Sequence, residues 1–260
     1  MKALASVHIV SWQGASLWLI EATPEASRQI KSTDFHAHHA IQVAISLGGR
    51  FKLDTKGHHA GGDAVAVASD TPHVFAAEGL FALLFIEPES RMGRAVSRGL
   101  FAETPLASVP KKLLGEFQAQ VIAASKARSR DGIVEAGSAF ISRLAGAGYF
   151  DAPDLRIRKV IAWAGANLER PISLSDAVPV SGLSAGRLRH LFVEQTGLPF
   201  KTFLLWLRLT RAVEIAASGA SLTEAAHEAG FADSAHLSRT FRRMFGVAPA
   251  MLEMSSNSPP

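Results

Sequence analysis

Residues 173–197 read SLSDAVPVSGLSAGRLRHLFVEQTG, and residues 221–246 read SLTEAAHEAGFADSAHLSRTFRRMFG. Both segments begin with a serine that is followed three positions later by an acid, an arrangement that caps the free N–H groups of a starting helix. Both then carry a glycine, Gly182 or Gly230, at which a helix can end and the chain can turn. The sequence therefore predicts two copies of a unit made of a helix, a turn and a second helix.

The second helix of each copy begins after a polar residue, Ser184 or Asp233, that can cap it. Apolar residues at helical spacing form its expected core face: Leu188, Leu191, Phe192, Leu237, Phe241 and Phe245. Basic or titratable side chains cluster beside them: Arg187, Arg189, His190, His236, Arg239, Arg242 and Arg243. This is the layout of a helix-turn-helix unit, whose second helix enters the major groove of DNA.

A further helix is expected between the copies, from Pro199 to Ser218, with proline at its start, where a missing N–H costs nothing. At 1.5 Å per residue this helix is about 30 Å long, close to the roughly 34 Å that separates successive major grooves on one face of DNA. The chain is therefore expected to present two recognition helices to adjacent major grooves of double-stranded DNA. Pro179, inside the first helix of the first copy, is expected to shorten or kink that helix.

The region before the repeat has a different pattern. Residues 6–87 contain short segments rich in Val, Ile, Phe and Leu, separated by turn signals such as Gly61-Gly62-Asp63, which predicts a small barrel or a sandwich of strands. Helices are expected from Lys111 to Lys126, from Asp131 to Leu144 and over 154–168. A break near 145–154 predicts a domain boundary, so the fold class is α+β multidomain.

Residues from about 154 to 253 resemble the DNA-binding domain of the AraC/XylS family of transcription factors. The matching residues are Gly182-Leu183-Ser184 with Leu188, Leu191-Phe192 and Thr196-Gly197, Arg208-Leu209 with Arg211-Ala212, Glu224-Ala225-Ala226, Gly230-Phe231, Ser238 to Arg243, Phe245-Gly246-Val247 and Pro249.

This resemblance implies a set of DNA contacts. Base contacts would fall at Gly186, Arg189 and His190 in the first unit, and at Ser234, Ala235, His236, Ser238 and Arg239 in the second, with Arg242 on a phosphate. Gly186 has no side chain, so Arg187 and Arg189 are the stronger candidates in the first unit, since arginine can donate two hydrogen bonds to guanine. The cap residue Ser184 completes the set.

The composition of the 260-residue chain excludes several kinds of site. Because there is no cysteine, a disulfide framework, a cysteine-ligated zinc finger, a cysteine nucleophile and a thiol redox switch are all excluded. The formal charge of +4 divides equally between residues 1–150 and 151–260, so net charge alone does not locate a DNA-binding region. The longest uncharged apolar run, Leu80 to Ile86, is too short to span a membrane, and the N-terminus is a poor signal peptide. We therefore expect a cytoplasmic protein with no membrane partner.

Histidines gather in the first domain at His36, His38 and His73. Because alternate residues of a strand share a face, a strand that starts near Phe35 would point His36, His38 and Gln42 to one side. The pattern resembles the metal site of the cupin barrel, with Gln42 where that fold has a glutamate. Such a site would suit zinc, nickel, copper or iron. The alternatives are a pocket for an organic ligand and histidines that only hydrogen-bond inside the barrel.

Two other features of the first half are a second pair of histidines and a pair of helices. His58 and His59 are expected on a solvated hairpin rather than in a site. The helices over 111–144 fit the dimerisation element that related regulators place after the barrel. Their apolar residues Leu113, Leu114, Phe117, Val121 and Ile122 could form the seam of a homodimer or could equally pack on the barrel.

These patterns predict three parts: a cupin-like effector-sensing barrel over 1–100, a helical dimerisation and linker region over 101–150, and an AraC-type DNA-binding domain with two helix-turn-helix units over 151–260. The predicted function is a sequence-specific transcriptional regulator whose barrel senses a small-molecule or metal effector, with RNA polymerase as a further partner. The alternative is a metal-dependent cupin enzyme fused to a DNA-binding module, which is disfavoured because no acid/base pair accompanies the histidines. An architectural DNA-binding protein would leave the cavity-lining histidine pattern unexplained.

Overall fold

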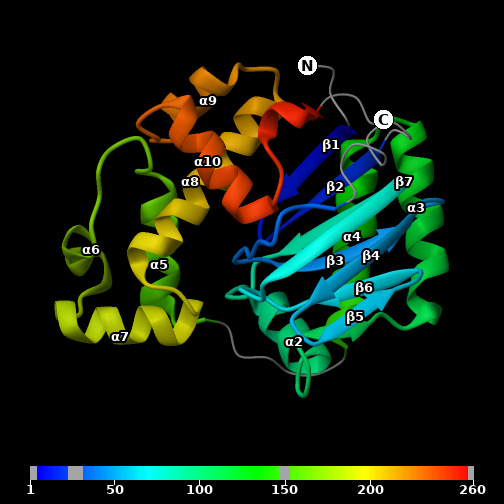
Figure 1. Cartoon of the computed structure of the whole chain (residues 1–260). Helices are drawn as coiled ribbons and strands as arrows, with labels where there is room; N and C mark the ends of the chain where they lie inside the picture. The colour runs from blue at the N-terminus through cyan, green and yellow to red at the C-terminus, as the bar shows by residue number, and fades with distance from the viewer. Residues whose placement is uncertain (1–4, 23–31, 147–152, 257–260) are drawn as a thin grey trace.

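The computed structural model describes residues 5–22, 32–146 and 153–256 (Figure 1). Within these ranges one sheet has the strand order β8, β6, β3, β7, β2, β1, β9, with β4 paired to β7 and β5 paired to β4. The strands are β1 (Ala5–Trp12), β2 (Ala15–Ala22), β3 (Ile41–Ser46), β4 (Arg50–Thr55), β5 (His58–Gly61), β6 (Ala64–Val67), β7 (His73–Ile86), β8 (Leu106–Ser108) and β9 (Leu252–Ser255).

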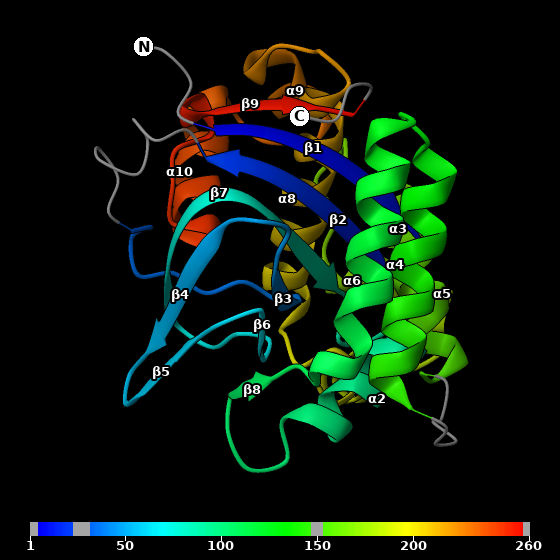
Figure 2. The same ribbon diagram turned by 90° about the vertical axis from the view of Figure 1, so that its right-hand side faces the viewer.

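Strand β7 changes partners along its length, which bends the sheet over on itself (Figure 2). Residues 73–78 of β7 pair with β4, whereas residues 79–86 pair with β2 on one side and, from Phe81, with β3 on the other. The prediction of a β-rich first domain is confirmed. Its inner face is lined by aromatic residues of β2 and β7, and this face carries the candidate site.

The strand that was expected near Phe35 begins later, because β3 starts at Ile41. His36 forms only an isolated bridge with His73, and the carbonyl of His38 accepts a hydrogen bond from the backbone N–H of Asp70 at 2.8 Å. The backbone of the histidine segment is therefore satisfied by the first residue of β7 and by the loop before it, rather than by a continuous strand ladder.

In the described part of the first half, the helices are α2 (Arg91–Leu100), α3 (Leu114–Lys126) and α4 (Arg130–Ala145), with a 3-10 turn over Lys111–Leu113. Helices α3 and α4 cover the outer face of the sheet (Figure 2), where Leu114, Phe117 and Val121 are at most 4% exposed. These three residues belong to the core between the sheet and the helices, so they are not available for the seam of a dimer. Leu113 and Ile122 are half-buried, and for them the alternative stays open.

The second half consists of α5 (Leu155–Gly165), α6 (Leu174–Ser181), α7 (Ala185–Thr196), α8 (Phe200–Ala217), α9 (Leu222–Glu228) and α10 (Ser234–Phe245), followed by a 3-10 turn over Pro249–Met251. Both predicted capping boxes are present, since the N–H of Ser173 donates to Asp176 and the N–H of Ser221 donates to Glu224, each at 2.8 Å. Gly182 and Gly230 have φ values of 66° and 77°, as a left-handed turn requires.

Pro179 does not shorten α6, so the expectation of a shorter helix was wrong, whereas the expectation of a kink stays a prediction. Helix α6 has 8 residues, whereas its counterpart α9, which has no proline, has 7. Pro179 and Ser175, one turn earlier, are both exposed. Water can therefore satisfy the Ser175 carbonyl that loses its helical donor.

The two helix-turn-helix units are attached to the sheet in different ways. The first unit, α6 and α7, has its own core with α5 and the start of α8. The second unit, α9 and α10, shares a core with the inner face of the sheet through Trp206, Phe241 and Phe245. After α10 the chain returns as β9, which runs parallel to β1 as an edge strand of the sheet. The sequence did not predict this strand.

Candidate nucleic-acid interface and histidine cluster

The second helix of the first unit, α7, turns its apolar residues inward and its basic residues outward. Leu188 and Phe192 are at most 1% exposed, whereas Arg187, Arg189 and His190 are exposed. Ser184 caps the helix by accepting a hydrogen bond from the N–H of Arg187. Gly186 is exposed, and a side chain added there would meet nothing within 4 Å. The surface of α7 is therefore free to approach a large partner.

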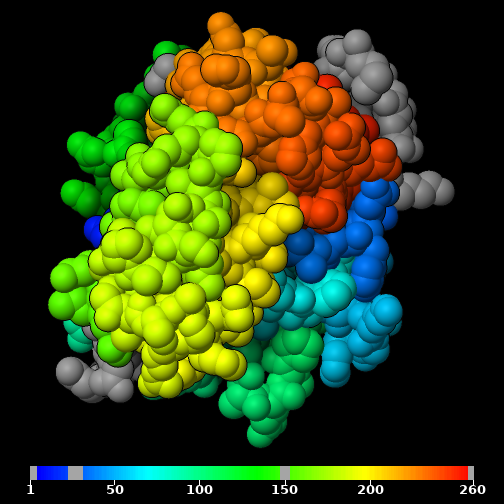
Figure 3. Space-filling view, turned by 90° about the vertical axis from the view of Figure 1, so that its left-hand side faces the viewer, coloured from blue at the N-terminus to red at the C-terminus, as the bar shows by residue number. Residues whose placement is uncertain are grey.

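The corresponding helix of the second unit, α10, has the same character. Ala235, Arg239 and Arg242 are exposed, and Ser234, His236 and Ser238 are half-buried. Asp233 caps the helix by accepting a hydrogen bond from the N–H of His236 at 2.6 Å. The two units lie on one face of the molecule, with part of α8 between them (Figure 3).

The three predicted histidines come together under the second unit. His36, His38 and His73 are 6%, 2% and 1% exposed, and their candidate ligand atoms all lie within 4.8 Å of one another. Each Nδ1 lies 2.8 to 2.9 Å from a backbone carbonyl oxygen, those of Asp34, Ala40 and Thr71 respectively. An Nδ1–H that donates to a carbonyl leaves Nε2 with a free lone pair, which is the tautomer that metal-ligating histidines use.

Burial keeps these imidazoles neutral. Loss of hydration on burial lowers the pKa of His36. Burial and, to a smaller extent, the charge of the neighbouring His36 lower the pKa of His73 to about 4. The pKa of His38 lies well below its ordinary value because of burial and of the two adjacent imidazoles. Neutral imidazole is the form that binds a metal.

Gln42 completes the cluster. Its Oε1 lies 3.0 Å from Nε2 of His38, while Nε2 of Gln42 and Nε2 of His73 are buried without a hydrogen-bond partner among the described residues. With Nδ1 of His38 donating to Ala40, Nε2 of His38 and Oε1 of Gln42 are both acceptors, and two facing acceptors need a proton or a cation between them, or the amide turned over. Three imidazoles and an amide oxygen fit a divalent transition metal.

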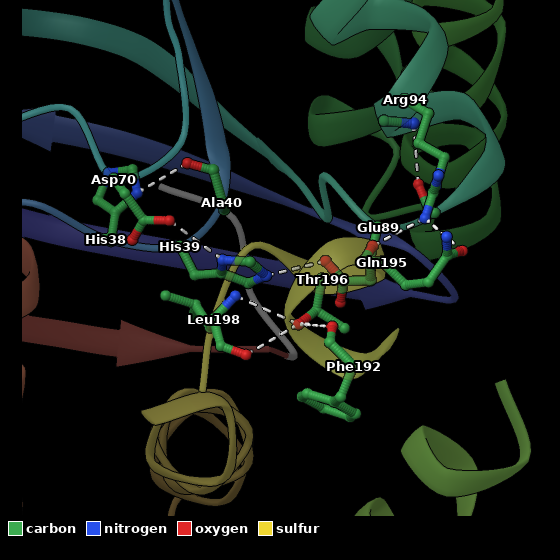
Figure 4. A network of polar contacts seen from close by, with 12 residues as sticks. His38, His39, Ala40, Asp70, Glu89, Arg94, Phe192, Gln195, Thr196 and Leu198 are labelled. Carbon is green, nitrogen blue, oxygen red and sulfur yellow. Dashed lines mark hydrogen bonds and ion pairs between the residues drawn. The ribbon is translucent and has the colours of Figure 1, made fainter. Parts of the chain in front are cut away.

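His39, which points away from this cluster, takes part in a different contact (Figure 4). Its Nε2 lies 2.9 Å from Glu89 and its Nδ1 lies 3.5 Å from Asp70. Burial opposes protonation, but the hydrogen bonds and charges of Asp70 and Glu89 outweigh it and raise the pKa of His39 to about 9. His58 and His59 are exposed on the β4–β5 hairpin, as predicted.

A cavity of about 130 Å³ lies beside the histidines on the inner side of the sheet. Its walls are mainly apolar and include Trp18 and Phe85, while His36 and Gln42 supply polar groups. Phe245 at the end of α10 also lines the cavity, with its ring centroid 5.0 Å from that of Trp18. The sequence predicts Phe245 in the core of the helical domain, because it lies on the apolar face of its helix. The helical spacing of apolar residues does not indicate that the last of them packs against the sheet.

The comparisons with known proteins agree with this geometry. Residues 180–253, which include α7 to α10, match the family model described as a helix-turn-helix domain. They form a helix-turn-helix domain of the AraC type. Outside this AraC-type domain the family model matches nothing in the chain.

Curated relatives of the AraC-type domain are named as transcriptional regulators. The chain is 33% identical over 106 residues to the uncharacterized HTH-type transcriptional regulator YidL of Escherichia coli K12, a stretch that is 40% of this chain and 36% of YidL. It is 35% identical over 97 residues to the HTH-type transcriptional activator RhaS of Escherichia fergusonii, or 37% of this chain and 35% of RhaS. The chain thus matches about a third of the length of each.

The fold of the whole chain has a solved counterpart. The crystal structure of ToxT from Vibrio cholerae O395 superposes with a TM-score of 0.58 over 95% of both chains, at 14% sequence identity. The sheet domain and the AraC-type domain therefore share the ToxT fold. In the described ranges no helix combines the length and the apolar character needed to cross a membrane.

Proposed function

We propose that this protein is a sequence-specific transcriptional regulator that reads two adjacent major grooves of DNA and responds to an effector bound in its sheet domain. The observation that carries the proposal is the pair of capped helix-turn-helix units, each exposing a basic second helix on the same face of the molecule. The relatives, named as transcriptional regulators, favour this function over a cupin enzyme. A cytoplasmic location follows from a DNA partner.

The proposed division of labour follows the sequence: sensing by residues 1–100, dimerisation and linkage by 101–150, and DNA binding by 151–260. Base contacts are assigned to Arg187, Arg189 and His190 of α7, with Ser184 and Gly186 at its start. In α10 they are assigned to Ser234, Ala235, His236, Ser238 and Arg239, with Arg242 on a phosphate.

The proposal is tested by selection from a random duplex library with the full chain. We expect enrichment of a motif with two half-sites about 10 base pairs apart, the repeat of one turn of DNA. Enrichment of no motif would exclude the proposed function.

For the effector we propose a divalent transition metal, zinc, nickel, copper or iron, held by His36, His38, His73 and Gln42. The backbone-bonded Nδ1 atoms and the unpartnered Nε2 of His73 support this assignment. The runner-up is a small organic molecule in the adjoining 130 Å³ cavity. One solved ToxT structure is of the protein with an unsaturated fatty acid bound.

Metal analysis of the purified chain separates the two effectors. We expect about one equivalent of metal per chain in the wild type, and loss of it in His36→Ala and His38→Ala, whereas His59→Ala, on the exposed hairpin, keeps it. Absence of metal from the wild type after incubation with each of the four ions would exclude the metal and leave the organic ligand or histidines that only hydrogen-bond inside the sheet domain.

We also propose a homodimer and a contact with RNA polymerase. Because Leu114, Phe117 and Val121 pack on the sheet, a dimer seam on α3 would have to use its outward residues instead. The mass of the chain in solution, measured by light scattering, tests the dimer.

A further inference from the structure

One of the basic side chains assigned to DNA already has an anionic partner. Nε of Arg242, on α10, donates to Oδ2 of Asp34 at 2.7 Å, and the side chains of the two residues are 62% and 56% exposed. Among the described residues, Arg187, Arg189, Arg239 and Arg243 make no ion pair. The sheet domain therefore engages Arg242 and leaves the other cations of the two recognition helices free.

Asp34 is held in place by its backbone. Its N–H donates to the carbonyl of Gly246 at 2.7 Å, directly after α10, and its own carbonyl oxygen lies 2.9 Å from Nδ1 of His36. The preceding residue, Thr33, is tied to the sheet by two hydrogen bonds with Phe75, at 2.8 and 2.9 Å. The backbone of Asp34 is thus held beside the end of the recognition helix, within reach of Arg242.

We propose that Asp34 competes with a DNA phosphate for Arg242, so that the docked sheet domain lowers the DNA affinity of the second recognition helix. This inference rests on the proposed function, which assigns Arg242 to the DNA backbone. A carboxylate and a phosphate oxygen offer arginine the same kind of charge-assisted hydrogen bond. DNA binding must therefore break the pair or place a phosphate beside the carboxylate.

The size of the effect follows from the exposure of the pair. An exposed ion pair is weakened by water and salt, and its loss changes an equilibrium constant by up to about fivefold. We therefore expect Asp34 to weaken DNA binding by about two- to fivefold, as a modulator of affinity rather than an on–off switch.

The test compares Asp34→Asn with Asp63→Asn. Both variants remove one negative charge from an aspartate that is 56% exposed, but Asp63 pairs with Lys111, in the turn before α3. With the duplex selected by the wild type, we expect Asp34→Asn to bind about two- to fivefold more tightly than Asp63→Asn. A plot of log Kd against log salt concentration should also be steeper for Asp34→Asn than for Asp63→Asn, by up to about the slope that one additional phosphate contact gives. Equal affinities of the two variants would overturn the proposal.

A double variant tests whether the gain acts through Arg242. Asp34→Asn combined with Arg242→Gln is compared with Arg242→Gln alone, and we expect these two proteins to bind equally. If Asp34→Asn tightens binding by the same factor in both backgrounds, Asp34 acts by general repulsion and the proposal is wrong.

Elution from immobilised heparin, a polyanion that needs no sequence recognition, separates this inference from the proposed function. We expect Asp34→Asn to elute at higher salt than Asp63→Asn, and coincident elution contradicts the competition. Should the wild type select no duplex while Asp34→Asn still elutes later, the proposed function fails and the competition for Arg242 stands.

Discussion

At the scale of single residues, the two recognition helices end at glycines with the same backbone conformation and different surroundings. Gly197 after α7 and Gly246 after α10 have φ values of 81° and 71°. A Cβ at Gly197 would meet nothing within 4 Å, whereas a Cβ at Gly246 would lie 2.6 Å from both the carbonyl oxygen of Asp34 and Nδ1 of His36. Gly246 therefore serves two needs, the left-handed turn and the close approach of the sheet domain.

The two glycines can be compared by the same substitution. We expect Gly197→Ala to lower the free energy of unfolding by about 1 kcal/mol through backbone strain alone. Gly246→Ala should lower it by about 1 to 3 kcal/mol more, because the added methyl group overpacks the contact with the sheet domain. Urea unfolding followed by tryptophan fluorescence measures both. Equal losses would mean that the second unit does not sit against the segment containing Asp34 and His36 in solution.

Glu87 is expected to make the stability of the folded protein depend on pH. Burial, reinforced by the charge of Glu89, raises the pKa of Glu87 to about 7, although the positive charge of His39 opposes this and Glu214 on α8 adds to it. The pKa of Glu87 in the folded state lies above the ordinary value of 4.5, so the folded protein holds this proton more tightly than the unfolded chain does. The contribution of Glu87 to the free energy of unfolding is therefore complete below pH 4.5 and is lost as the pH rises through about 7.

We therefore expect Glu87→Gln to be more stable than the wild type at pH 8, by about 1 kcal/mol or more, and to lose this advantage by pH 5. Thermal unfolding at the two pH values measures the difference. Glu103→Gln, at an exposed carboxyl, is the control for the change in charge. An advantage that is the same at both pH values would argue against a half-buried Glu87 that titrates near pH 7.

At the scale of elements, the parts that the sequence predicted are those specified by local chemistry. The capping boxes at Ser173 and Ser221 and the turn glycines are read directly from adjacent residues, and the structure contains all of them. Helix α2 was missed because it has only 10 residues and because the residues that it buries, Gly93, Ala95 and Val96, are small.

Elements that depend on distant partners could not be predicted in this way. Strand β9 has only 4 residues and pairs with β1 at the opposite end of the chain, so its sequence carries no local signal. The histidines were identified from spacing, but their grouping depends on the loop before β7 that brings His73 against His36. The ion pair of Arg242 with Asp34 joins residues 208 positions apart.

At the scale of the whole molecule, the two units differ in how the sheet domain holds them. The first unit is held by polar contacts, in which Arg94 of α2 donates to the carbonyl and Oε1 of Gln195 at 2.8 and 2.9 Å (Figure 4). The second unit is held by a shared core, by Asp34 and by β9. Changes in the sheet domain should therefore reach the second unit more directly than the first.

We propose that one chain reads DNA with both recognition helices. This is tested by measuring how the wild type, Arg189→Ala and Arg239→Ala protect guanine N7 of the selected duplex from methylation. We expect the wild type to protect two major-groove stretches about 10 base pairs apart. Arg189→Ala should lose protection at one stretch and Arg239→Ala at the other, each at a cost of about 1 to 3 kcal/mol in binding. A single protected stretch, or two stretches that neither variant alters, would contradict the claim.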